Sequence, residues 1–190
     1  MNRSYALFIL MLLIGTDVLV AQDREKELVW SGSATLLSSD FKMRRTAQTK
    51  KIKTGKNSYS TLEGFIYCGI NFSYESNGRQ VRYEVYAYMD PSQSWLRDSS
   101  SVETLEHEQA HFNIAEIYAR KLKSDLRSER NLKKARKKYA DSFKDLQEKQ
   151  RDFDKDHMSE VGVEKKWILW INQNLEKLNE YSSKEIRISQ

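Results

Sequence analysis

The sequence predicts an α+β fold in which a small antiparallel sheet precedes a helical half. Two observations support this prediction. Apolar residues alternate on both sides of a hairpin signal between residues 65 and 89, and from about residue 102 they recur every three or four positions. A chain of 190 residues is long enough for one domain with a real core. We expect that single domain to span residues 22–190.

Residues 1–21 have the composition of a signal peptide. Arg3 supplies a positive charge, an apolar run extends from Tyr5 to Gly15, and the small residue Ala21 precedes the expected cleavage site. The apolar run is too short to span a bilayer. An uncleaved anchor is the weaker interpretation. We therefore expect an exported mature protein, periplasmic or extracellular, without a transmembrane anchor.

The sheet is predicted from residues 27–89. Residues 27–43 indicate a short strand and a turn, and the basic residues 44–59 indicate a mobile loop or a weak edge strand. Residues 65–75 and 79–89 each place their apolar side chains on one face, and Ser76-Asn77-Gly78 between them is a hairpin signal. Pro91 then marks the end of the sheet.

The rest of the sequence predicts three helices. The first runs from about residue 102 to about 127, after a capping box formed by Ser100 and Glu103. The second carries a narrow apolar stripe from Leu132 to Phe153, which is typical of a helix packed against a partner. The third covers about residues 160–181.

The first helix contains the stretch His107-Glu108-Gln109-Ala110-His111. Residues four apart are separated by only about 40° around a helix, so both imidazoles can reach one zinc ion. Glu108 is close enough to act as general base toward a zinc-bound water. This pattern predicts a zinc-dependent hydrolase, with two helix-face histidines bonded to core carbonyls as the alternative interpretation.

A hydrolytic zinc site also needs a third protein ligand. Glu116 lies about 180° from His107 around a straight helix and so faces the wrong way. We predict His157 as the third ligand, since a helical hairpin can carry it back beside the first helix. Glu160 and Glu164 are the carboxylate alternatives.

Four segments resemble the DUF922 family of bacterial exported proteins, which are predicted zinc-dependent proteases. The resembling segments are Leu105–Glu116 with its continuation Ala119–Leu122, Ser39-Asp40-Phe41-Lys42, Ser94-Trp95-Leu96, and the late residues Asp154, His157 and Trp167. The resemblance implies a metalloprotease with a zincin-like helix packed beside the sheet. Asn113 stands where such sequences often have Asp, which makes it a candidate for orienting a metal ligand through a hydrogen bond.

The net charge of +5 is concentrated in two places. Lys133, Lys134, Arg136, Lys137 and Lys138 cluster in the second helix, and four lysines lie between residues 50 and 56. In an exported protein these charges favour anionic envelope components over nucleic acid as partners, although a solvated basic face is the preferred interpretation. The expected partner of the zinc site is a peptide or protein substrate. The alternative function is a non-catalytic zinc-binding envelope protein that uses its basic helices as a partner surface.

Overall fold

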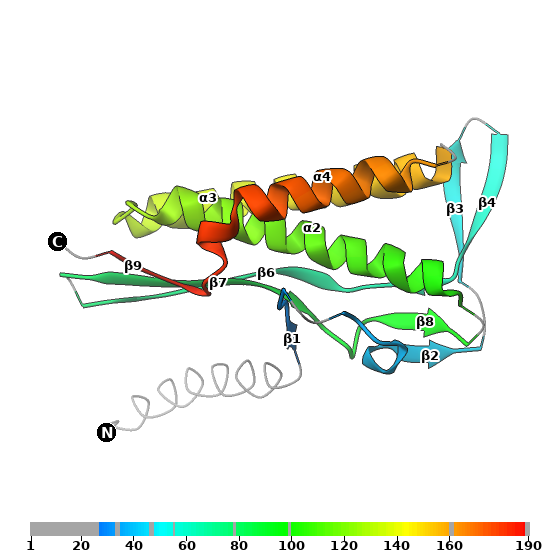
Figure 1. Ribbon diagram of the computed structural model, residues 1–190, viewed down its shortest axis with the longest axis horizontal. Coiled ribbons are helices and arrows are strands. Elements are labelled where there is room, and N and C mark those ends of the chain that lie inside the picture. The colour runs from blue at the N-terminus through cyan, green and yellow to red at the C-terminus, as the bar shows by residue number, and fades with distance from the viewer. Residues whose placement is uncertain are drawn as a thin grey trace, which may run out of the picture.

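The computed structural model describes residues 27–188, except 33–34, 46–47, 55, 78, 99 and 160–161. The signal-peptide prediction for residues 1–21 therefore lies outside the described residues. The predicted α+β class is confirmed: an antiparallel main sheet is followed by three helices. The first of these helices lies on the sheet, and the other two pack against it (Figure 1).

The main sheet is built around one long hairpin. Strands β6 (Cys68–Ser76) and β7 (Val81–Met89) pair antiparallel along their whole length, as the alternating sequence predicts. The short strands β1 (Leu28–Val29) and β9 (Glu185–Ile188) pair with the two ends of β7. Strand β9 corrects the expectation that the chain after Pro91 is helical, since its four residues return to the sheet.

Two smaller sheets complete the β part. In one, β8 (Trp95–Arg97) lies between β2 (Lys42–Arg44) and β5 (Gly64–Phe65), with β2 and β8 parallel. In the other, β3 (Gln48–Thr54) and β4 (Lys56–Leu62) form a hairpin. Of the two alternatives for the basic stretch after residue 44, the strand is confirmed and the loop is wrong. Pro91 ends the main sheet, but β8 follows it.

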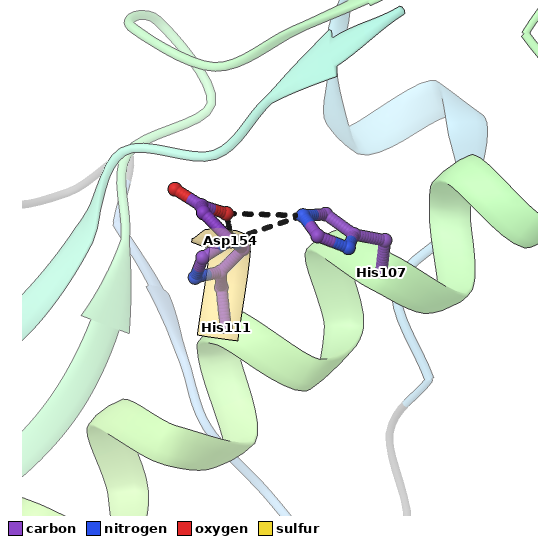
Figure 2. A group of neighbouring side chains, drawn as sticks. All are labelled: His107, His111 and Asp154. Atoms are coloured by element: carbon purple, nitrogen blue, oxygen red, sulfur yellow. Dashed lines mark hydrogen bonds and ion pairs between the residues drawn. The ribbon is translucent and has the colours of Figure 1, made fainter. Parts of the chain in front are cut away.

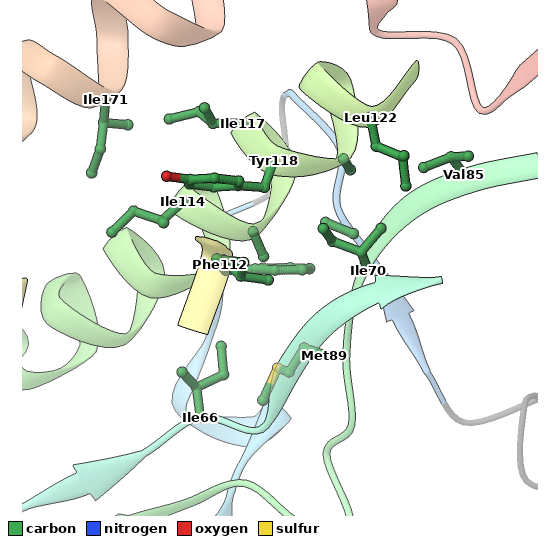
Figure 3. Close-up of a cluster of buried hydrophobic side chains, with 14 of the residues drawn as sticks. Ile66, Ile70, Val85, Met89, Phe112, Ile114, Ile117, Tyr118, Leu122 and Ile171 are labelled. Carbon is green, nitrogen blue, oxygen red and sulfur yellow. The ribbon is translucent and has the colours of Figure 1, made fainter. Parts of the chain in front are cut away.

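Helix α2 (Val102–Leu126) is the centre of the fold. One side of it packs on β6 and β7, and another packs on α3 (Leu132–Ser159) and α4 (Glu164–Lys177). Phe112, Ile114, Tyr118 and Leu122 of α2 lie in the core that Figure 3 shows. Because α2 is packed on several sides, buried residues occur along most of its length, as is typical of a core helix.

Capping fixes where α2 begins. Ser101, rather than Ser100, is the N-cap, and its side chain accepts a hydrogen bond from the backbone N–H of Thr104. The predicted capping residue is therefore wrong by one position. This start places His107 in the second turn of the helix, near the end where β5 and β8 lie. A short 3₁₀ helix, Asn179–Tyr181, follows α4.

No helix among the described residues is both long enough and apolar enough to cross a membrane.

Candidate metal centre

Helix α2 brings the two predicted histidines together. His107 and His111 are one turn apart, and their Nε2 atoms are separated by 3.2 Å. His111 is buried, whereas the side chain of His107 retains 23% of its exposure. Two imidazole nitrogens therefore point toward one place on the side of α2 that faces α3.

Asp154 of α3 supplies a third donor atom at the same place (Figure 2). Its Oδ1 lies 2.8 Å from His111 Nε2 and 3.3 Å from His107 Nε2. Ligands at zinc bond lengths of about 2.0–2.1 Å in a tetrahedral site lie about 3.3 Å from one another. Two of the three separations match that edge length, and the third is a hydrogen-bond length. Two imidazoles and one carboxylate form a donor set that suits zinc.

The Asp154 carboxylate is ionised in this setting. Burial raises its pKa, but hydrogen bonding and charge interaction with His111 and His107 outweigh burial and hold the pKa far below its ordinary value. The side chain is 41% exposed, so the cluster is open to solvent on the Asp154 side.

Phe153, the neighbour of Asp154, holds the two imidazole rings in place. Its ring is stacked on His107, with centroids 4.7 Å apart, and meets His111 edge-on at 4.9 Å. Gln150, one turn earlier in α3, donates a hydrogen bond to the backbone oxygen of His111. The packing between α2 and α3 therefore fixes the orientation of the donors.

Glu108 lies beside the cluster and turns toward β5. Its side chain is 4% exposed, and its carboxylate accepts a hydrogen bond from the backbone N–H of Ile66. Burial raises the pKa of Glu108 to about 7, and the Asp154 charge adds to that rise while His107 opposes it. The absence of a side chain at Gly64 makes room for this carboxylate, because a Cβ atom there would lie 2.9 Å from Glu108 Oε1.

The DUF922 family model, described as a bacterial protein of unknown function, matches residues 88–162. These residues are similar to the DUF922 family, and we call them the DUF922 segment. The DUF922 segment runs from the end of β7 to the end of α3 and so includes His107, Glu108, His111 and Asp154. Neither the curated proteins nor the solved structures contain a match to the chain. The family description names no activity, and peptide cleavage and export therefore stay predictions.

His157, the predicted third ligand, lies within the DUF922 segment but one turn beyond the donor cluster. Its ring centroid is 4.7 Å from that of His107. Its Nε2 lies 3.7 Å from Glu164 Oε1, and its buried Nδ1 has no hydrogen-bond partner among the described residues. Burial and the neighbouring His107 lower the pKa of His157. The structure thus groups Asp154, rather than His157, with His107 and His111.

Two other candidates of the DUF922 segment, Asn113 and Glu116, lie away from the cluster. Asn113 Oδ1 accepts hydrogen bonds from Trp30 Nε1 and Gln109 Nε2, so it does not contact either histidine. Glu116 is buried and paired with Arg120, as its helical angle predicts. Glu160 lies outside the described residues. Outside this segment, the thiol of Cys68 accepts a hydrogen bond from Gln150, and burial raises the pKa of the thiol to about 12.

Proposed function

We propose that this chain is a zinc-dependent hydrolase that cleaves peptide bonds, with His107, His111 and Asp154 as the zinc ligands. The observation that carries the proposal is the convergence of three donor atoms within 3.3 Å of one another beside a buried carboxylate. Structural zinc sites have four protein ligands, whereas catalytic ones have three and an open position. Three donors and a solvent-exposed Asp154 favour the catalytic type.

Zinc in this site would supply a Lewis acid and lower the pKa of a coordinated water molecule toward neutrality. Glu108 would act as general base: its carboxylate accepts the proton released on attack and returns it to the leaving amine. A pKa of about 7 suits a group that must both take and give a proton near neutral pH. The hydrogen bond from the Ile66 N–H holds the carboxylate in one orientation.

The alternative, a non-catalytic zinc protein that binds partners through its basic helix, has less support. Two of the five basic side chains are already paired with carboxylates: Lys137 with Asp141, and Lys138 with Glu129. These contacts reduce the positive charge that is free to attract an anionic envelope component.

The substitution Glu108→Gln tests the proposal. We expect zinc content to stay at one ion per chain while peptide hydrolysis falls about 10²- to 10⁴-fold. The exposed Glu148→Gln on α3 is the matched control and should retain full activity. Zinc content is measured by elemental mass spectrometry, and hydrolysis is measured on a mixture of synthetic peptides. An active Glu108→Gln protein would refute the assigned base, and a zinc-loaded wild type that cleaves no peptide would refute the substrate class.

A further inference from the structure

A cavity of about 200 Å³ lies beside His107 and is lined by residues of helices α2, α3 and α4. Helix α2 contributes Glu103, Glu106, His107 and Ala110, and helix α4 contributes Glu164, Trp167, Ile168 and Ile171. Both sets follow the spacing i, i+3, i+4, i+7, which places each set on one face of its helix. Phe153 and His157 of α3 complete the lining of the cavity.

The walls of this cavity combine an apolar floor with an acidic rim. The floor is made of Ala110, Phe153, Trp167, Ile168 and Ile171. All three rim glutamates, at positions 103, 106 and 164, are exposed. Among the described residues that line the cavity there is no lysine or arginine, although the chain as a whole carries a net charge of +5. The local charge is therefore opposite to the overall charge.

The floor is held firmly in place. Trp167 Nε1 donates a hydrogen bond to Asp156, and the Trp167 ring meets Phe153 edge-on at 5.2 Å. Phe153 in turn stacks on His107. A preformed wall of this kind binds a ligand without the cost of first ordering itself.

We infer that this cavity binds a lysine or arginine side chain of the peptide substrate, next to the bond that is cleaved. The inference rests on the proposed function, because only a substrate held at the zinc site would bring its side chain here. A volume of about 200 Å³ is below the roughly 300–1,000 Å³ of pockets for whole drug-sized ligands, and it suits a single side chain.

The chemistry of a basic side chain matches each part of the cavity. Lysine and arginine bury an apolar stem and keep a cationic head in water. The stem would lie on Trp167 and Ile168, and the head would reach Glu106 and Glu164 at the rim. Glu103 lies about one helical turn before His107, which is about 6 Å along the helix axis. The acidic rim is therefore near the candidate metal centre.

The test compares two peptides, acetyl-Ala-Ala-Lys-Ala-Ala-amide and the same peptide with norleucine in place of lysine. Each is titrated into zinc-loaded Glu108→Gln protein, and NMR shift changes give the affinity without cleavage. We expect the lysine peptide to bind about two- to fivefold more tightly, as one partly exposed ion pair allows. The double substitution Glu106→Gln, Glu164→Gln should remove that preference. The control Glu176→Gln, exposed on the same helix α4, should keep it.

Equal affinities for the two peptides, or a preference that persists in the double variant, would overturn the inference. The proposed function is tested separately. A lysine preference in binding together with no hydrolysis by the wild type would refute the hydrolase and leave only the binding of a basic side chain supported. Hydrolysis without a lysine preference would refute the cavity assignment alone.

Discussion

His111 Nε2 and Asp154 Oδ1 lie 2.8 Å apart, although 43 positions separate the two residues in the sequence. The contact joins α2 to α3 at the end of the helical layer where α4 begins (Figures 1 and 2). His107 reaches the same oxygen at 3.3 Å. Each of the following predictions depends on this convergence or on the buried charges around α2.

Zinc binding should depend on Asp154 more than on His157. We expect Asp154→Ala to lower zinc content to well below one ion per chain, because a tetrahedral hydrolytic site needs three protein ligands. His157→Ala should retain its zinc, since Asp154, not His157, lies with the other two donors. Elemental mass spectrometry after dialysis measures both. Zinc lost from His157→Ala and retained by Asp154→Ala would reverse the assignment.

Glu108 should lower the stability of the metal-free protein above neutral pH. Its pKa is raised from 4.5 to about 7, so the unfolded chain loses this proton earlier than the folded one. The free energy of unfolding therefore falls as pH rises from 4.5 to 7. In the presence of a chelator, Glu108→Gln should be more stable than wild type by about 2–3 kcal/mol at pH 8.

At pH 4 the difference between the two proteins should vanish, because the carboxyl group is protonated in both states. Urea unfolding at pH 4 and pH 8 measures the difference in the free energy of unfolding between the two proteins. A constant difference across this range would show that the effect of Glu108→Gln is not due to ionisation.

Gly64→Ala should disturb the position of Glu108 from the side of β5. A Cβ atom at Gly64 would meet Leu96 Cδ2 at 2.8 Å, Glu108 Oε1 at 2.9 Å and Thr104 Cγ2 at 3.0 Å. We expect a loss of stability of about 1–3 kcal/mol and a displaced Glu108. Gly32→Ala is the control, because its Cβ would meet only ordinary contacts at 3.5 Å or more. Thermal unfolding of the two variants gives the comparison, and equal behaviour would contradict it.

Lys123 should make the protein more stable as pH rises above 8. Its side chain is 1% exposed, and burial lowers its pKa from 10.5 to about 8. Between these values the unfolded chain keeps a proton that the folded chain has released, so the free energy of unfolding rises with pH. We expect this rise to be about 1 kcal/mol per pH unit between pH 8.5 and 9.5.

The rise should be missing in Lys123→Met, which has no group to titrate there. The difference between the two urea-unfolding series isolates this lysine from the tyrosines that also titrate at high pH. A parallel pair of curves would show that Lys123 keeps its proton when folded, held by its bonds to Ser183 and Glu116.

The parts of the fold with a long periodic pattern could be predicted from the sequence. The β6–β7 hairpin has nine residues on each strand, and α2 begins at the predicted residue and ends one residue early. Strands β8 and β9 have three and four residues, too few for alternation to be recognised. Their pairing depends on distant segments, β2 and β5 for one and β7 for the other.

The candidate site was only half predictable for a similar reason. The two histidines are close in sequence, and helical geometry alone brings them together. Asp154 is one of three aspartates at alternate positions in α3, and only the packing of α3 on α2 selects it. One signal was available in the sequence: Asp154 directly follows Phe153, which belongs to the apolar stripe that continues from Leu146. Asp154 lies in the donor group with the two histidines, whereas His157 was predicted from its nitrogen donors alone.

The position of the three donors has a consequence for the lifetime of the protein. An ion held by His107, His111 and Asp154 would act as a clip that closes chain loops of 43 and 47 residues. Such a clip stabilises the folded state by about 2.7 kcal/mol when free zinc is at one hundred times its dissociation constant. Where zinc is scarce, the helical layer would open more often and be degraded sooner. The abundance of the protein would then follow the local supply of the metal.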